Sequence, residues 1–263
     1  MTQAKDNAAT LPFAKSGEFT MGSITGKLVL AMLRGNDYAH AGEEEAIDLV
    51  LGPLAKTPET RLLDVGCGIG GTARYVEERG WGKVTGVDLD PANIAAATER
   101  HPGIEFISSD AVLLEQHVTT RFDVVYSFNA FFLFADQPAA LKAMRAVARP
   151  TAKLAIFDYV DLGGYEEWHQ EKRTPGMRHA LQLDVMETTL QDSGWNLDRI
   201  VPAHADYQRW YETLVASIEC KREAIAAQSS ASFFDFVRMR YTETLDDVRA
   251  GRLGGATIYA SAM

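Results

Sequence analysis

The feature that most constrains the fold of this chain is the segment from Leu62 to Gly71, which reads LLDVGCGIGG. An apolar run that contains one acidic residue leads directly into glycines and then into a helix-forming pattern. Glycine allows positive φ angles and lets bare backbone approach a ligand, which a Cβ atom would block. Gly66, Gly68 and Gly71 match the G-x-G-x-x-G spacing of nucleotide-binding turns, although that spacing alone is a weak signal. The segment predicts a strand, a ligand-binding turn and a helix.

The acidic residue before the glycines indicates the charge of the ligand. Asp64 lies two residues before Gly66, where a carboxylate would repel the pyrophosphate of a dinucleotide. A carboxylate there suits a ligand whose nearby end is cationic. S-adenosylmethionine has such an end, because it carries an ammonium group and a sulfonium. The pattern therefore favours S-adenosylmethionine over NAD.

Further acidic residues follow later predicted strands. The strand 83–88 ends at Asp88, whose carboxylate could accept two hydrogen bonds from a ribose diol, in NAD and in S-adenosylmethionine alike. A strand over 104–108 leads to Asp110, which could accept from an adenine amino group. Each acid could instead cap the next helix, and for Asp90, which precedes a proline, capping is the better interpretation. The combination of acids and glycine turn is what favours a cofactor site.

Apolar runs alternate with helical patterns along most of the chain. This alternation predicts an α/β fold with a doubly wound, mostly parallel sheet of seven strands. Ligands of such sheets bind beyond the carboxyl ends of the strands, where the candidate cofactor residues lie. The predicted strands cover 61–65, 83–88, 104–108, 122–128, 153–159, 196–201 and 254–260. The predicted helices cover 23–33, 43–51, 71–79, 91–100, 137–148, 185–193 and 207–250.

The predicted organisation has four parts. Residues 1–22 are polar and mixed, and we expect a mobile N-terminal segment there. Residues 23–55 are expected to form helices that cap the cofactor site, and residues 56–160 the cofactor-binding core. Residues 161–263 are expected to supply a mobile lid segment over 161–182, a long helical insertion and the final strands. The long flanking segments favour a small acceptor enclosed by a lid.

In this order, the residues resemble a class I S-adenosylmethionine-dependent methyltransferase of the type 11 or type 25 kind, over about residues 38 to 160. The resemblance implies a Rossmann-like fold, methyl transfer and S-adenosylmethionine as cofactor. It places the adenine edge at Asp110 and Ala111, and the transferable methyl group near 127–129. The cofactor-binding residues that it implies are Tyr38, Asp64, Gly66, Gly68, Asp88, Leu89, Asp110, Ala111, Ser127 and Phe128.

Outside this core, the chain faintly resembles the phosphoethanolamine (phosphobase) N-methyltransferases. The resemblance involves Tyr38, the strand end at 157–159, and a helix that contains Tyr207 and Trp210. It implies that Tyr38 covers the cofactor and that Arg178 meets an anionic group of the substrate. We also predict that Tyr207 and Trp210 contact the substrate.

That family pairs a tyrosine before the first helix with a histidine after the fourth strand. In this chain the equivalent positions are near Gly22 and at Leu133, so the Tyr/His dyad is missing. Phosphoethanolamine itself is therefore not predicted as the acceptor. The architecture and a slight preference for an amine acceptor remain.

Methyl transfer is an in-line displacement at the sulfonium methyl, and it requires an aligned lone pair and dry surroundings. Residues 129–136, after the fourth predicted strand, read NAFFLFAD and contain no histidine, lysine or glutamate. Their aromatic side chains, including Phe132, could hold a cationic or flat apolar group, or could equally be core. Asn129 and the Tyr159 hydroxyl are the polar candidates to orient the nucleophile, and we predict them as catalytic residues.

A hydroxyl acceptor would benefit from a base, whereas an amine needs little more than positioning and loss of its proton. Four histidines in the lid-forming segments could reach the site as a base, and for each a solvated loop position is the better interpretation: His40, His169, His179 and His204. We therefore predict methyl transfer to a small molecule, with a slight preference for an amine nitrogen. The alternatives are O- or C-methylation with a lid histidine as base, a non-catalytic S-adenosylmethionine-binding protein, and, least favoured, an NAD-dependent oxidoreductase.

Composition limits the partners. Lys and Arg total 26 against 36 Asp and Glu, a net charge of −10, which disfavours nucleic acid because phosphate neutralisation needs clustered cations. No His/Cys/Asp grouping has metal-ligand spacing, so no metal is predicted. Two cysteines and an N-terminus without a signal or anchor pattern suggest a cytoplasmic protein without membrane contact. The identity of the acceptor and the oligomeric state stay open.

Overall fold

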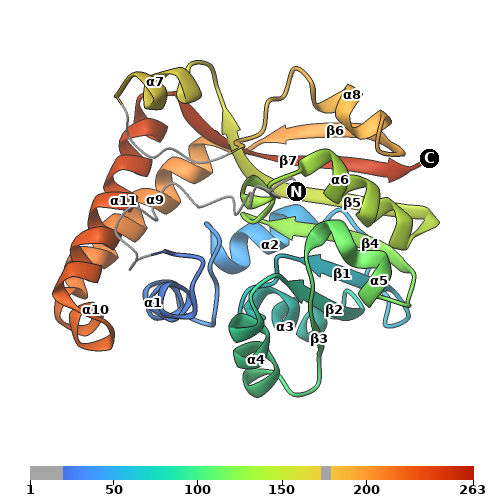
Figure 1. The fold of residues 1–263 in the computed structure, drawn as a ribbon, viewed down its shortest axis with the longest axis horizontal. Helices are drawn as coiled ribbons and strands as arrows, with labels where there is room; N and C mark the ends of the chain where they lie inside the picture. Colours follow the sequence, from blue (N-terminus) through green and yellow to red (C-terminus); the bar gives the residue numbers. More distant parts are fainter. Residues whose placement is uncertain (1–19, 173–178) are drawn as a thin grey trace, which may run out of the picture.

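The computed structural model describes residues 20–172 and 179–263 of the chain. Most of the predicted mobile segment 1–22, and the predicted substrate residue Arg178, lie outside the described residues. Seven strands form one sheet in the order β3-β2-β1-β4-β5-β7-β6 (Figure 1). Their bounds are β1 (Arg61–Val65), β2 (Lys83–Asp88), β3 (Glu105–Ser108), β4 (Phe122–Phe128), β5 (Ala148–Asp161), β6 (Trp195–Pro202) and β7 (Leu253–Ala262).

The predicted doubly wound, mostly parallel sheet is confirmed. Strands β1 to β5 pair in parallel, and β7 runs antiparallel between β5 and β6. The strand order reverses between β1 and β4, where Asp64 lies beside Tyr126 in the register. Such a reversal opens a crevice at the carboxyl ends of the two strands, because their connecting helices leave on opposite faces. The glycine turn begins at this crevice.

Helices cover both faces of the sheet. Their bounds are α1 (Ile24–Arg34), α2 (Glu43–Leu51), α3 (Gly71–Glu78), α4 (Pro91–Arg100), α5 (Leu114–His117), α6 (Gln137–Val147), α7 (Tyr165–Lys172), α8 (Met186–Gln191), α9 (His204–Cys220), α10 (Arg222–Gln228) and α11 (Ala231–Arg249). Alternating strand residues feed two hydrophobic clusters, as the two-residue period of a strand requires. Leu62 joins the cluster with α1, α2, α3, α9 and α11, and Leu63 joins the cluster with α6 and α8.

Short polar side chains set the helix starts. The Asp90 carboxylate accepts from the backbone N–H of Ala92 at 2.9 Å, so the predicted cap of α4 is confirmed. Ser23 caps α1 and Ser230 caps α11 in the same manner. These caps satisfy N–H groups that have no partner within the helix.

The long helical insertion predicted over 207–250 is present in the structure. It consists of α9, α10 and α11, with breaks at Lys221 and at Ser229–Ser230. Ser230 interrupts the helical backbone because it adopts an extended conformation and caps the start of α11. The three helices stand together beside the sheet, with α1 between them and the β1–β3 half (Figure 1). The segment expected as a lid contains α7 among its described residues. No helix in the described part of the chain is long and apolar enough to cross a membrane.

Candidate functional site

The glycine turn after β1 forms a backbone cradle that admits no side chain. Gly66, Gly68 and Gly70 have φ angles of 86°, 55° and 86°, which L-residues rarely adopt. A Cβ atom at Gly66 would lie 2.3 Å from the Cβ atom of Ala130. The turn is also tied to β2, because the backbone N–H of Gly66 donates to the Val87 carbonyl at 2.7 Å. The cradle is therefore rigid and requires glycine.

Asp64 lies at the carboxyl end of β1, almost fully buried. Its Oδ2 atom has no hydrogen-bond partner among the described residues. Burial, followed by the charge of Asp88, raises the pKa of the Asp64 carboxyl to about 8, while Tyr126 and Lys27 act in the opposite direction. A buried carboxylate without a partner is costly unless a cation meets it. The site thus suits a cationic ligand group beside the glycine cradle.

Asp88 ends β2 and organises the turn. Its carboxylate accepts from the backbone N–H groups of Gly68 and Asp90, each at 2.9 Å, and from the Asn93 side-chain amide at 3.2 Å. A carboxylate has about four acceptor positions. Three are used within the chain, which leaves about one for a ligand hydroxyl, where the sequence suggested two. Asp88 therefore has a structural task as well as its predicted one.

The predicted adenine residues lie at the next strand ends. The Asp110 carboxylate accepts from the backbone N–H of Val112 at 3.1 Å and caps a short 3₁₀ helix (Ala111–Leu113), so the capping alternative is confirmed. Ala111 is buried, whereas the side chain of Leu89, beside Asp88, is 69% exposed. An apolar side chain exposed there leaves a face for a flat ring, so the adenine contact stays a prediction for these residues.

The connection between α1 and α2 crosses the glycine turn. A Cβ atom at Gly71 would lie 2.6 Å from the backbone of Asp37. Tyr38 follows, buried against the ring of Tyr75, and its hydroxyl donates to Glu44 at 3.3 Å. The predicted cover of the cofactor is thus a segment fixed on the start of α3.

His40, in the same connection, is buried, so its expected solvated position is wrong. Its Nδ1 atom lies 3.0 Å from the Ala41 carbonyl, and since a carbonyl only accepts, Nδ1 carries the proton. The Nε2 atom has no partner among the described residues and is left as an acceptor. Burial lowers the pKa of His40 to about 3, and the ring packs on Phe128, with centroids 4.9 Å apart. No sequence pattern separated this histidine from the others.

Asn129 follows β4 and joins three segments. Its Oδ1 atom accepts from the backbone N–H of Ala41 at 3.0 Å, and its Nδ2 atom donates to the Tyr207 hydroxyl at 2.7 Å. A weaker contact at 3.4 Å reaches Asp158. Its φ of 44° is a left-handed value that asparagine tolerates. The neighbouring Ser127 is also engaged, because its hydroxyl donates to the Val65 carbonyl at 2.8 Å.

Asp158, in β5, is a buried acid that the sequence prediction missed. Its carboxylate accepts from the backbone N–H groups of Tyr159 at 2.8 Å and Phe132 at 3.1 Å. Burial raises the pKa of Asp158 to about 7, although these hydrogen bonds lower it. The signal in the sequence was an acid placed within the apolar run 154–160 of this strand.

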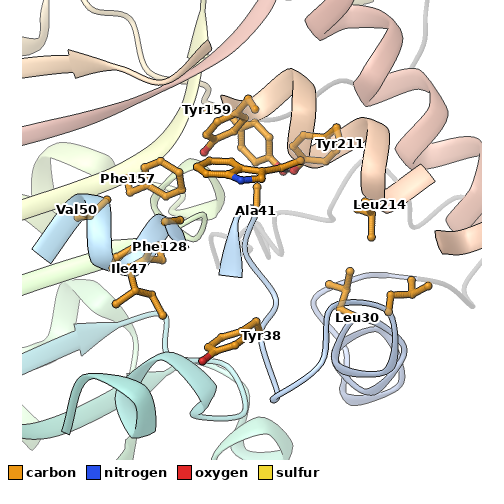
Figure 2. Close-up of a cluster of buried hydrophobic side chains, with 14 of the residues drawn as sticks. Leu30, Tyr38, Ala41, Ile47, Val50, Phe128, Phe157, Tyr159, Tyr211 and Leu214 are labelled. Atoms are coloured by element: carbon orange, nitrogen blue, oxygen red, sulfur yellow. Dashed lines mark hydrogen bonds between the residues drawn. The ribbon is translucent and has the colours of Figure 1, made fainter. Parts of the chain in front are cut away.

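Aromatic side chains gather beside Asn129 and Asp158. The rings of Phe132 and Tyr207 lie 5.0 and 5.5 Å from the ring of Tyr159. The Tyr159 hydroxyl contacts that of Tyr211, and Figure 2 shows these two side chains close together. Trp210 packs on Tyr207 and donates to Glu45 of α2 at 2.9 Å. With Asn129, the structure therefore brings together five of the predicted acceptor-side residues. We call Phe132, Tyr159, Tyr207, Trp210 and Tyr211 the aromatic cluster.

The other lid histidines differ from one another. His169 is buried and lies 2.8 Å from Asp247, so its expected solvated position is wrong. The backbone N–H of Gly255 donates to His204 at 3.3 Å, whereas His179 is exposed as expected. Among the described residues, no group of histidine, cysteine and acidic side chains is placed to hold a metal.

Comparisons with known proteins agree with this arrangement. Residues 63–156 match the family model described as a methyltransferase domain. Phosphoethanolamine N-methyltransferase 1 of Zea mays is 26% identical over 231 residues, which cover 77% of this chain and 46% of the relative. A phthiotriol/phenolphthiotriol dimycocerosates methyltransferase of Mycobacterium leprae is 31% identical over 153 residues, which cover 54% of this chain and 56% of the relative. The chain spans about half the length of these curated relatives.

Solved structures share the fold. Phosphoethanolamine N-methyltransferase 2 of Haemonchus contortus, in complex with phosphomonomethylethanolamine and S-adenosylhomocysteine, superposes with a TM-score of 0.76 at 20% identity. The superposition covers 90% of this chain and 57% of that one. The Rossmann-like fold expected from the resemblance is thereby confirmed.

Proposed function

We propose that this chain, a class I S-adenosylmethionine-dependent methyltransferase by family, methylates a small-molecule acceptor enclosed between its core and its helical insertion. The observation that carries the proposal is the position of Asp64. A buried acid with an open acceptor atom lies beside a glycine cradle, at the point where the strand order reverses. The aromatic cluster lies at the end of the neighbouring strands β4 and β5.

The residues at the ends of β1 and β2 fit S-adenosylmethionine. Asp64 would accept from the ammonium group, and that cation would stabilise the ionised carboxylate. Gly66 and Gly68 would hold the methionine part against bare backbone, and the remaining acceptor position of Asp88 would take a ribose hydroxyl. When bound, the cofactor supplies an activated methyl group on a sulfonium. NAD would bring its anionic pyrophosphate to this turn, next to Asp64, so these residues favour S-adenosylmethionine.

The aromatic cluster supports an enclosed, dry acceptor site. Its rings come from the loop after β4, from β5 and from α9, and the side chains of Tyr159, Tyr207 and Trp210 are buried. Water exclusion favours methyl transfer because it removes competing hydrogen bonds from the nucleophile. Asn129 and Tyr159 would orient the acceptor through positions that their own hydrogen bonds hold in place. Arg178 keeps its proposed role toward an anionic group on the acceptor.

An amine remains our preferred acceptor class. Electron-rich rings attract cationic and N-methylated groups, and Asp158 adds a buried acid next to them. A hydroxyl acceptor is the second candidate, because the Nε2 atom of His40 is a buried acceptor without a partner among the described residues. That atom would accept a hydrogen bond from an O–H nucleophile and orient it, although its low pKa makes it a weak base. A carbon acceptor is less favoured.

The location that we propose from the sequence is cytoplasmic, and the two free cysteines fit it.

The test incubates the purified chain with S-adenosylmethionine and panels of amines, phenols, alcohols and carboxylic acids, with S-adenosylhomocysteine and methylated product read by mass spectrometry. We expect turnover with a member of the amine panel, which includes phosphoethanolamine. Cofactor binding without turnover on any panel would favour a non-catalytic binding protein. Tight NAD binding without a response to S-adenosylmethionine would overturn the proposal. An Asn129 or Tyr159 variant with full turnover would remove that residue from the site.

A further inference from the structure

A lysine side chain from α1 lies next to the glycine cradle. The side chain of Lys27, in α1, lies across Gly68, where its Nζ and Cε atoms come within 3.6 Å of the position that a Cβ atom would take. No sequence pattern singled out this lysine. Lys27 is half-buried, and it makes no hydrogen bond or ion pair with another described residue. A lysine that stays unpaired beside a rigid turn has its charge available for a ligand.

Lys27 shares the turn with the unpaired acid. Burial and neighbouring acids raise the pKa of the Asp64 carboxyl and of the Cys67 thiol, and the positive charge of Lys27 opposes both shifts, so it acts on the same few residues around the cradle. The charges of Lys27 and Asp64 are opposite, and they do not form an ion pair with each other. A ligand group that carries both charges, an amino acid zwitterion, is complementary to this pair.

The position of Lys27 is set by anchors at both ends of α1. Before the helix, the Gly22 carbonyl accepts from the side-chain amide of Asn93, which also donates to Asp88, both at 3.2 Å. Near its end, the carbonyl of Met32 accepts from the Lys221 ammonium at 2.6 Å. The helix is thus tied to the acid at the end of β2 on one side and to the helical insertion on the other. Lys27 is presented by a fixed element.

We propose that Lys27 binds the carboxylate of the methionine part of the cofactor, while Asp64 binds its ammonium group. The two side chains together would recognise the zwitterion and would discriminate against adenosine ligands that lack it. Lysine contributes a charge-assisted hydrogen bond to such a carboxylate. The inference rests on the proposed cofactor, and its test measures binding rather than turnover.

Isothermal titration calorimetry with three ligands measures separately how the ammonium and the carboxylate of the ligand contribute to affinity. S-adenosylhomocysteine carries both, decarboxylated S-adenosylmethionine keeps only the ammonium of that end, and 5′-deoxy-5′-methylthioadenosine keeps neither. We expect Lys27→Met to weaken S-adenosylhomocysteine about ten- to hundredfold and to change the other two affinities less than about twofold. Asp64→Asn should weaken the first two ligands and spare the third. Lys27→Arg should retain most of the affinity.

The matched control is Lys142→Met, which removes an exposed lysine of α6 and should leave all three affinities unchanged. Circular dichroism checks that each variant is folded. Equal weakening of all three ligands by Lys27→Met, or no change for S-adenosylhomocysteine, would overturn the inference while leaving the proposed function intact. A wild-type chain that fails to bind S-adenosylhomocysteine would overturn both. A chain that binds it in a Lys27-dependent way but methylates nothing would overturn only the proposed function.

Discussion

The two halves of the site use polar groups in opposite ways. On the cofactor side, Asp64 keeps a buried acceptor atom without a partner among the described residues, and Lys27 is also unpaired. On the acceptor side, the side chains of Asn129 and Asp158 are bonded to backbone groups or to each other.

This difference separates recognition from support. Unpaired buried groups cost stability, so a fold retains them where a ligand compensates for the cost. Fully bonded groups hold a pocket in shape and contribute to folding with or without a ligand. Changes on the cofactor side should therefore alter binding more than folding, and changes on the acceptor side should alter folding and turnover more than cofactor affinity.

The largest expected effect is at the glycine cradle. Gly66→Ala places a Cβ atom 2.3 Å from that of Ala130 at a φ of 86°. We expect a destabilisation of roughly 2–5 kcal/mol and loss of measurable S-adenosylhomocysteine binding by calorimetry. Gly103→Ala is the control, because nothing lies within 4 Å of a Cβ atom there. Unchanged binding by Gly66→Ala would show that the cradle does not hold the cofactor.

The next largest effect is expected at Asp88, whose alanine variant we compare with that of the neighbouring Asp90. Asp88→Ala should weaken S-adenosylhomocysteine by about 2–4 kcal/mol, since it removes a charge-assisted hydrogen bond and releases the turn. Asp90→Ala removes only a helix cap and should cost about 1 kcal/mol of stability at constant affinity. Calorimetry and urea denaturation measure the two quantities. Equal affinities for the two variants would contradict the assignment of Asp88.

A smaller effect concerns pH. Burial raises the pKa of Asp64 to about 8, so the ligand-free protein holds this acid protonated at lower pH. An ammonium ligand needs the carboxylate, and affinity should rise about tenfold per pH unit up to about pH 8. Calorimetry from pH 6 to pH 8 measures this rise. Asp64→Asn should abolish it, and a flat profile in the wild type would refute the pairing.

The same pKa shift predicts an opposite trend in stability. An acid whose pKa is higher in the folded state than in the unfolded state favours folding at low pH. This contribution is complete below pH 3.8, the ordinary value, and is lost as the pH rises through about 8 for Asp64. Asp158, whose pKa is raised to about 7, acts in the same direction. Urea denaturation of the ligand-free protein should therefore show decreasing stability from pH 5 to pH 8.

The smallest expected effect is on the acceptor side. Tyr207→Phe removes the hydrogen bond from Asn129 and should cost about 1 kcal/mol of stability, lower turnover and leave S-adenosylhomocysteine affinity unchanged. Tyr259→Phe is matched, because it removes a hydrogen bond to the Val50 carbonyl away from the cluster. It should show the same stability loss with normal turnover. Identical turnover of the two variants would place Tyr207 outside the acceptor site.

The cofactor side could be predicted because its residues follow strand ends in the sequence. Asp64 and Asp88 come immediately before turns, and a parallel sheet places such ends at one edge. Two of the predicted cofactor acids also have structural roles, and capping by Asp110 was among the predicted alternatives. Asp88 uses most of its acceptor positions for hydrogen bonds around the turn, and Asp110 caps a 3₁₀ helix. A pattern of residue types does not show how many acceptor positions of a carboxylate are already used by hydrogen bonds within the fold.

The acceptor side was harder to predict because distant segments build it. Asn129 meets Ala41 and Tyr207 across the fold, and neither contact leaves a local pattern. The burial of His40 and His169 depends in the same way on what packs against them. The helical insertion was predicted as a whole, whereas its breaks at Lys221 and at Ser229–Ser230 are visible only in the structure.

The amino-acid sequence by itself determined the α/β fold, the glycine turn and the acids at the strand ends beside it. Those features depend on period, spacing and glycine, which are local properties of a chain. Only the tertiary structure decided which polar groups remain unpaired, that Lys27 lies over Gly68 of the turn, and that Asn129 links distant segments by hydrogen bonds. The reason is physical, since burial and hydrogen-bond pairing are set by every segment that packs against a residue.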